Sequence, residues 1–449
     1  MNLLSVLATR LLILADGVAD LGRLAGITLG SLSGPGSFKD RIVKRLTTSA
    51  GQRVTFGVLR AFLPNLVIGR KLATAYDNGG SALVTRYSDV QEVLNRAEDF
   101  EVVYGPRMIE ITGGQNFFLG MQDSPTYTRD VSNMRLAVRR TDVPAIIGPF
   151  VAEAASSLVA AAPGRIDVPQ DLTLKVPARL VGRYFGMPGP SEQEMIDWTT
   201  LMFWYLFIDL NADAGLDAKV EAAARACRAY LDQAIQVRKA ASSGPDDVLQ
   251  RCLAMQAAGL PGMDDLGIRN YLIGLIIGAV PTISKAAIQA LDQLLDRPDA
   301  LAGAQAAARA DNDELLGRYI FEALRFNPIN PVIYRRAVRD TVIARHTLRA
   351  CRIPRSTMVF AANLSAMFDR LELPDPTRFR IDRPWEDYIL WGYGLHTCFG
   401  AHINRASIPA LLKPLLKQPN LRRAAGPAGQ VDMAGTPFPA HLVLEFDRA

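Results

Sequence analysis

A single cysteine, Cys398, ends a loop that is rich in glycine and directly precedes a predicted helix starting near Ala401. Gly392, Gly394 and Gly400 lack a Cβ, so the loop backbone can adopt positive φ and let a flat ligand come close. Backbone N–H groups and the positive end of the following helix can stabilise a thiolate. A thiolate held in this way is suited to be the axial ligand of a haem iron.

A lone cysteine in a glycine-rich turn is more often a small buried apolar residue. Here, Trp391 lies seven residues before Cys398 and can shield the sulfur from water. The segment Trp391-Gly392-Tyr393-Gly394-Leu395-His396-Thr397-Cys398-Phe399-Gly400 resembles the haem-binding loop of the cytochrome P-450 family, Phe-Gly-x-Gly-x-His-x-Cys-x-Gly. The first position differs, because Trp391 replaces the Phe. The resemblance extends roughly from Ser81 to Phe446, and it implies haem b (iron protoporphyrin IX) as the cofactor and Cys398 as the ligand of its iron.

Composition excludes several other classes of protein. The 449 residues include 50 Lys plus Arg and 45 Asp plus Glu, which gives a formal net charge of +5. No basic run is interleaved with aromatic residues, so binding to nucleic acid is not predicted. The four cysteines are widely separated and show neither metal-ligand spacing nor a disulfide framework, which favours the reducing cytoplasm.

Residues 1–36 are predicted to form an amphipathic helical extension that ends in the turn-forming stretch 33–37. Charged residues interrupt its apolar run at Arg10, Asp16, Asp20 and Arg23, whereas a membrane-spanning helix needs about 20 largely uncharged residues. No transmembrane segment is therefore predicted, and packing of the extension on the rest of the protein is favoured over a membrane surface. Residues 37–449 are predicted to form a single haem-thiolate domain.

Helical periodicity dominates the chain, and the predicted strands are few and short. The fold class is therefore mainly α with small β-sheets, as the cytochrome P-450 fold would be. The predicted helices include 89–95, 264–295 and 313–326, and the predicted strands are 83–87, 342–344, 358–361 and 442–446. Residues 100–123 contain four glycines and no lasting periodicity, so they are predicted to be a long irregular loop.

Glu322 and Arg325 lie three residues apart in a predicted helix, so they share one face and can pair. Such pairs are common on protein surfaces and contribute little there. The downstream segment Pro376-Thr377-Arg378-Phe379-Arg380-Ile381-Asp382-Arg383 resembles the Pro-x-x-Phe-x-x-x-Arg stretch of the same family. The resemblance implies a buried network of Glu322, Arg325 and Arg383 that holds the cysteine loop and performs no chemistry.

The two haem propionates need cationic or hydrogen-bonding partners if the macrocycle is buried. The resemblance assigns His396 and Arg335 to this role. A third partner in the family comes from a His-x-x-x-Arg pattern after an Asp-x-Pro turn. In this chain Tyr127 replaces the His and Val131 the Arg, so Tyr127 and Arg129 are the predicted substitutes, with Arg135 as a further possibility.

The predicted helix 264–295 contains Gly278-Ala279-Val280-Pro281-Thr282, where the family has Ala-Gly-x-acid-Thr. Gly278 and Ala279 leave space above the iron, and Thr282 keeps the hydroxyl that assists oxygen activation. Pro281 replaces the acid. An interior proline removes the hydrogen bond to the carbonyl of Ile277 and costs about 3 kcal/mol, which a cofactor pocket can tolerate if the kink opens a groove.

The resemblance implies a monooxygenase that inserts one oxygen atom from O2 into an apolar small molecule. Electrons would come from NAD(P)H through a ferredoxin reductase and a ferredoxin, because no flavin or iron–sulfur segment is recognised in this sequence. One alternative is an enzyme of the same fold that uses peroxide or rearranges an oxygenated substrate, which the loss of the acid favours. A haem sensor without catalytic activity is the alternative from another class.

Two further surfaces are predicted. Apolar side chains are expected to form the wall of the substrate pocket: Ile109, Phe117, Phe118, Phe203, Val280 and Phe438. Basic residues after the cysteine are expected to present a positive face to an acidic ferredoxin: Arg405, Lys413, Lys417, Arg422 and Arg423.

Overall fold

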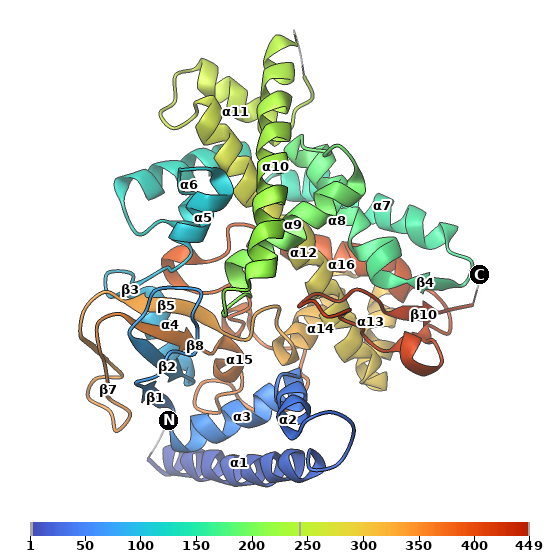
Figure 1. The fold of residues 1–449 in the computed structure, drawn as a ribbon. Coiled ribbons are helices and arrows are strands. Elements are labelled where there is room, and N and C mark those ends of the chain that lie inside the picture. The colour runs from blue at the N-terminus through green and yellow to red at the C-terminus, as the bar shows by residue number, and fades with distance from the viewer. Residues whose placement is uncertain (1–2, 242–243, 448–449) are drawn as a thin grey trace. The chain divides into compact units, whose positions relative to one another are not determined.

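The computed structural model describes residues 3–241 and 244–447. The chain divides into two compact units. The first comprises the residues up to Glu101 together with Arg325–Thr397, and the second comprises Val102–Leu324 and the residues from Cys398 onward. Each unit therefore combines segments that lie far apart in the sequence, and Figure 1 labels most of their elements.

The first unit contains all strands of the largest sheet and the N-terminal helices (Figure 1). Its elements are α1 (Leu3–Gly30), α2 (Phe38–Leu46), α3 (Ser49–Phe62), β1 (Asn65–Ile68), β2 (Gly80–Val84), α4 (Tyr87–Asn95), β3 (Phe100–Glu101), β5 (Ile333–Ala337), β6 (Thr341–Ile343), β7 (Cys351–Ile353), β8 (Thr357–Ala361) and α15 (Asn363–Ala366).

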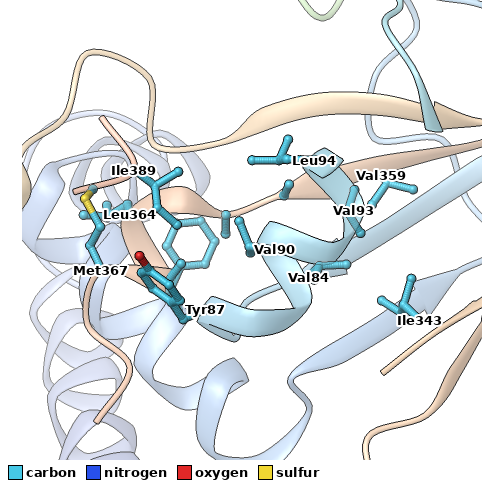
Figure 2. Close-up of a cluster of buried hydrophobic side chains, with 14 of the residues drawn as sticks. Val84, Tyr87, Val90, Val93, Leu94, Ile343, Val359, Leu364, Met367 and Ile389 are labelled. Atoms are coloured by element: carbon cyan, nitrogen blue, oxygen red, sulfur yellow. The ribbon is translucent and has the colours of Figure 1, made fainter. Parts of the chain in front are cut away.

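The large sheet has the strand order β1-β2-β8-β5-β3. Strands β2 and β8 pair in parallel, with Ala82 opposite Val359, and β8 pairs antiparallel with β5. Apolar side chains from β2, β8, α4 and α15 form one buried cluster (Figure 2). Helix α4 contributes Val90, Val93 and Leu94 to it, which lie three and four residues apart and thus share one helical face.

The second unit is mainly helical. Its elements are α5 (Gly105–Thr112), α6 (Pro125–Ala137), α7 (Gly148–Ala161), β4 (Arg165–Asp167), α8 (Lys175–Leu180), α9 (Glu192–Phe207), α10 (Ala214–Ala240), α11 (Val248–Ala257), α12 (Asp265–Leu295), α13 (Pro298–Arg309), α16 (Ala401–Leu416), β9 (Arg422–Arg423) and β10 (Val443–Glu445). Helix α14 (Asp313–Phe326) begins in this unit and ends in the other. The mainly α fold class with small sheets is confirmed.

Helix α12 is the longest helix that the structure describes, and its bounds agree with the predicted 264–295. The side chain of Asp264 caps its N-terminus by accepting a hydrogen bond from the N–H of Gly267. The helix continues through Pro281 without interruption. Pro281 has no N–H, so the backbone hydrogen bond to the carbonyl of Ile277 is absent, and burial of the apolar residues on both sides keeps the helix together.

The N-terminal extension is helical, as predicted. Helix α1 packs along α3 (Figure 1), and Asp16 forms an ion pair with Arg370. Asp20, which is buried, pairs with Arg23. The ion pair between Asp16 and Arg370 therefore links α1 to another segment of the first unit, whereas Asp20 and Arg23 pair within α1.

Two sequence-based expectations were wrong, and one helix was not predicted. Residues 100–123 are not a loop throughout, because 105–112 form α5, where Gly105 and Pro106 begin the helix and Gly113 ends it at φ 78°. The predicted strand 83–87 is displaced, since pairing with β8 places the strand at 80–84 and Tyr87 starts α4. Helix α13 was not recognised, although its alanine-rich sequence has high helix propensity.

Two described helical segments are long and apolar enough to cross a membrane, judged by length and composition. One is α12, and 89% of its apolar window is buried inside the protein. The other, Val143–Ala161, is 22% buried, and its last turns belong to α7, which packs on α16. Helices inside water-soluble folds meet the same criteria, so these segments do not identify a membrane span.

Candidate active site

Cys398 lies at the N-terminus of α16 in the second unit, where the predicted helix start near Ala401 is confirmed. Its carbonyl accepts the N–H of Ala401 at 3.2 Å. Burial raises the pKa of the Cys398 thiol, and a hydrogen bond from the backbone N–H of Gly400 acts in the opposite direction. The expected backbone N–H stabilisation of the sulfur is therefore supplied by Gly400. The expected positive φ at Gly400 was wrong, since its φ is −83°.

The other two loop glycines are needed for their backbone conformation. Gly392 and Gly394 have φ values of 77° and 71°. A Cβ on Gly394 would also lie 2.8 Å from the carbonyl oxygen of Leu94, at the end of α4. A side chain at position 394 would thus meet both backbone strain and a steric clash, which explains a glycine there.

Cys398 lines an apolar cavity in the second unit, together with residues of α12, α16 and the segment after α5. The lining includes Phe117, Phe118, Leu180, Phe185, Leu275, Gly278, Ala279, Ile283, Phe399, Gly400, Ile403 and Asn404. Gly278 is exposed although it lies in the middle of a buried helix, and a Cβ added to it would meet no atom within 4 Å. The expected free space at Gly278 and Ala279 thus opens into the cavity that contains the sulfur.

The hydroxyl of Thr282 donates a 2.5 Å hydrogen bond to the carbonyl of Gly278, one turn earlier in α12. Thr282 is buried, with 8% of its surface exposed. Pro281 does not line the cavity of Cys398. It contributes instead to a second cavity, together with Ser284, Lys285 and Phe438. Because residue 281 is proline, no carboxylate directly precedes Thr282. The Thr282 hydroxyl already has an acceptor within the helix, the carbonyl of Gly278.

His396 and Arg335 lie close together in the first unit. Arg335 is buried, on the strand β5, and its guanidinium donates to the carbonyl of Tyr334 at 2.8 Å. Burial and the positive charge of Arg335 lower the pKa of His396 to about 4. A buried guanidinium beside a half-buried imidazole suits an anionic partner such as a carboxylate.

Tyr127 and Arg129 on α6, the predicted substitutes for the third propionate partner, differ in their burial. Tyr127 is buried, with its N–H bonded to the capping hydroxyl of Ser124. Arg129 forms an ion pair with Asp130 at 2.8 Å, and the side chain is 41% exposed. The structure therefore gives the guanidinium of Arg129 a carboxylate partner within the protein, which the sequence pattern did not indicate.

Hydrogen bonds of two members of the predicted buried network, Arg325 and Arg383, show how it holds the chain. Glu322 and Arg325 are both fully buried on α14. Arg325 donates to the carbonyls of Met367 at 2.8 Å and Arg378 at 3.2 Å, and Arg383 also donates to the carbonyl of Arg378, at 3.3 Å. The two arginines thus bind one backbone carbonyl of the segment before the cysteine loop. A role in positioning this segment, without chemistry, agrees with the expectation.

The predicted substrate-pocket residues divide into three groups. Phe117 and Phe118 line the cavity of Cys398, and the ring of Phe118 lies 5.4 Å from that of Phe399. Phe203 and Phe438 contact each other at 6.0 Å, with Phe438 in the second cavity.

The remaining two predicted residues are not among those that line the cavity of Cys398. Ile109 is 40% exposed on α5, and the buried Val280 is not among the residues that line the cavity of Cys398. Two lining residues of the cavity could have been predicted from helical spacing, because Leu275 and Ile283 lie four residues on either side of Ala279. Leu180 and Phe185 carry no sequence signal, since tertiary packing alone brings them there.

Four of the five residues of the predicted basic face are paired with carboxylates. Lys413 and Lys417 pair with Asp311, Arg423 pairs with Asp292 and Asp296, and Arg422 pairs with Asp447. A different basic cluster surrounds His402, whose pKa is lowered by burial and by the charges of Arg140, Arg405 and Arg135. Arg135 and Arg140 are exposed and form no ion pair with any residue that the structure describes.

These residues fit a haem. A cysteine sulfur faces a cavity lined by aromatic and aliphatic side chains, and a glycine and an alanine leave space in the middle of a long helix. Within the first unit, a buried arginine and a half-buried histidine supply basic groups for carboxylates. Apolar walls, a sulfur donor and basic groups match the macrocycle, iron and propionates of such a cofactor.

Comparison with known proteins agrees with this chemistry. The family described as "Cytochrome P450" matches residues 192–421. Cyclomarin C epoxidase CymV of Salinispora arenicola is 26% identical over 301 residues, which cover 66% of this chain and 73% of that protein. Mycinamicin IV hydroxylase/epoxidase of Micromonospora griseorubida is 26% identical over 363 residues, covering 76% and 82%. The ligand-free structure of TbtJ1, described as a cytochrome of this family, superposes with a TM-score of 0.72 at 22% identity, covering 89% of this chain and 98% of that one.

Proposed function

Because this chain belongs to the cytochrome P-450 family and is a haem-thiolate monooxygenase, we propose that Cys398 is its iron ligand and that an acidic ferredoxin supplies its electrons. Haem b, when bound, supplies the iron at which O2 is activated and one oxygen atom is transferred to an apolar small molecule. The observation that carries the proposal is the common cavity of Cys398, Gly278 and Ala279.

The protein's own residues have separate roles in this proposal. The Gly400 N–H stabilises the thiolate. His396 and Arg335 bind the propionates, with Tyr127 as a further hydrogen-bond donor. Arg325 and Arg383 position the preceding segment through the carbonyl of Arg378. Phe117 and Phe118 exclude water and contact the substrate. A screen of small apolar compounds for loss of the iron-bound water in the haem spectrum tests this assignment, and product formation then identifies a substrate.

The basic cluster around His402 is the proposed docking surface for a ferredoxin, with an NAD(P)H-dependent ferredoxin reductase as the electron source and the cytoplasm as the compartment. Exposed positive charge accelerates the encounter with an acidic partner. The double variant Arg135→Glu/Arg140→Glu is expected to slow reduction of the haem by an acidic ferredoxin about tenfold at low salt. The difference is expected to shrink as salt rises, because charges are screened beyond ~8–10 Å.

The matched control for this experiment is Lys417→Glu/Arg422→Glu, which changes the net charge equally at positions already paired with Asp311 and Asp447. Stopped-flow reduction measures both variants. Equal rates in the Arg135/Arg140 variant and the control would rule out the His402 cluster as the docking surface.

A second candidate function is favoured by Pro281. Splitting O2 consumes two protons, and the Thr282 hydroxyl, whose hydrogen is donated to the Gly278 carbonyl, can pass protons on but has too high a pKa to supply them. An enzyme that uses peroxide, or rearranges an oxygenated substrate, needs no such delivery. In that case Cys398 keeps its role and the ferredoxin is not required.

Pro281→Asp separates the two functions. If the protein is a monooxygenase with impaired proton delivery, the variant is expected to form several times more product per NADPH than the parent. Pro281→Ala restores the helix N–H without a carboxylate and is expected to leave this ratio unchanged. Each variant is also measured in a Lys285→Met background, because Lys285 lies one turn after position 281 and can neutralise a new carboxylate.

Turnover of the parent protein with and without peroxide distinguishes the monooxygenase from the peroxide-using enzyme. Turnover with added hydrogen peroxide and no ferredoxin, faster than turnover with ferredoxin and NADPH, would support the peroxide-using enzyme. Tight coupling in the parent that Pro281→Asp makes worse would contradict the role given to position 281.

A further inference from the structure

The second cavity of the mainly helical unit contains a buried lysine. This cavity has a volume of about 160 Å³ and is formed by the part of α12 after Pro281, by α9 and by the segment around Phe438. Lys285 lines it and is 8% exposed. Its ammonium nitrogen lies 5.5 Å from the centre of the Phe438 ring. Burial lowers the pKa of Lys285 to about 8.

Within the described ranges 3–241 and 244–447, no residue forms a hydrogen bond or an ion pair with the ammonium group of Lys285. Buried lysines are normally paired, because an isolated ammonium group loses its hydration without compensation. Asp197 lines the same cavity, but its carboxylate accepts a hydrogen bond from Gln193 at 2.9 Å and makes no ion pair with Lys285. Among the described residues, the face of the Phe438 ring thus attracts this cation, but no carboxylate or other hydrogen-bond acceptor pairs with it.

The other polar groups of the cavity are engaged, with one exception. The hydroxyls of Ser284 and Thr173 bond to each other at 2.9 Å, and Gln170 donates to the carbonyl of Ala440 at 2.9 Å. The hydroxyl of Thr200 on α9 is buried and has no partner among the described residues. One ammonium group and one hydroxyl thus remain as donors in a small cavity.

We propose that this cavity binds the carboxylate of the substrate, through an ion pair with Lys285 and a hydrogen bond from Thr200. The inference rests on the proposed oxygenase function and names its substrate class, an apolar molecule with one carboxylate group. A single cation and a single hydroxyl match a monovalent carboxylate better than a phosphate, which carries more charge and more acceptor oxygens.

The position of the cavity on α12 relates it to the site of oxidation. Gly278, in the cavity of Cys398, and Lys285 are seven residues apart and therefore lie on the same face, separated by ~10 Å along the helix. The apolar part of the substrate would run past Phe438 toward Gly278. Oxidation is therefore expected at a carbon several bonds away from the carboxyl group.

The test uses the haem-loaded full chain and the saturated straight-chain acids from octanoic to hexadecanoic acid, each paired with its methyl ester. Dissociation constants are measured from the ligand-induced change in the haem spectrum. The parent is expected to bind at least one acid about tenfold or more tightly than its ester, as a charge-assisted hydrogen bond in a buried site would produce. If no acid binds better than its ester, the inference is overturned.

Substitutions at Lys285 and Thr200 test whether this cavity causes the preference for the acid over its ester. In Lys285→Met, which keeps the length and apolarity of the side chain, the ratio of acid to ester affinity is expected to fall to about one. Lys285→Arg retains a cation and is expected to keep a ratio above that of Lys285→Met, and Thr200→Val is expected to lower the ratio about threefold. A Lys285→Met ratio equal to that of the parent would overturn the inference.

Two further readouts separate this inference from the proposed function. Acetate, a short carboxylate, is expected not to weaken binding of the long acids, because the apolar part of those acids supplies most of their affinity. Competition by acetate at the same concentration as the acid would indicate a general anion site and would contradict a substrate subsite. The spectrum of the reduced carbon monoxide complex reports on Cys398 alone. A normal thiolate spectrum combined with equal affinity for acid and ester would reject the carboxylate site and leave the oxygenase function intact.

Discussion

A Cys398→Ser variant is expected to fold like the parent and to lose monooxygenase turnover completely. Serine has nearly the same shape, and its hydroxyl can accept the hydrogen bond that the Gly400 N–H makes with the sulfur. Its pKa is far too high for it to bind iron as an anion, whereas a thiolate donates electron density to the metal. Product formation with ferredoxin, reductase and NADPH measures the loss.

The control measurement for folding is the thermal midpoint of this variant, compared with that of the parent in the absence of added haem. A midpoint within a few degrees of the parent shows that activity was lost without unfolding. Parent-like turnover in Cys398→Ser would contradict the assignment of the iron ligand.

An Arg325→Met variant is expected to lose about 3–5 kcal/mol of unfolding free energy. The guanidinium is fully buried, donates to the carbonyls of Met367 and Arg378, and lies 4.5 Å and 4.6 Å from the ring centres of Phe326 and Phe368. Methionine fills part of the volume but donates no hydrogen bond, so the Met367 carbonyl loses the donor Arg325, whereas the Arg378 carbonyl keeps the donor Arg383. Urea unfolding, followed by circular dichroism, measures the change.

Arg380→Met is the matched control. Arg380 lies in the same segment as Arg378 but pairs with the exposed carboxylate of Asp382, and such pairs contribute about 0–1 kcal/mol. Equal small losses in the two variants would show that Arg325 has no special role in holding this segment.

The parts of the fold that were predicted correctly are those encoded by local sequence. Asp264, a typical N-cap residue, predicts the start of α12. The glycines before Cys398 predict a turn, and two of them adopt the positive φ values that such a turn requires. The order of the five-stranded sheet was not predictable in this way. Strand β8 lies between β2 and β5, and its pairing with β2 joins residues more than 270 positions apart.

The site shows the same division. The sulfur, the small residues of α12 and the basic pair of His396 and Arg335 are recognisable because their types and spacing are part of the chemistry. Charge compensation is not recognisable from spacing. Lys413 and Lys417 were expected to be free cations, but Asp311 from a distant segment neutralises them, while Lys285, which no motif singled out, lacks a partner among the described residues.

The most direct test of the central claim is the absorbance spectrum of the reduced, carbon monoxide-bound protein in a series of four cysteine variants. A thiolate ligand shifts the main band strongly to the red, because sulfur donates electron density to the iron. The parent and the variants Cys227→Ser, Cys252→Ser and Cys351→Ser are expected to show this band, and Cys398→Ser is expected to lack it. A red-shifted band that persists in Cys398→Ser would contradict the assignment of the haem ligand.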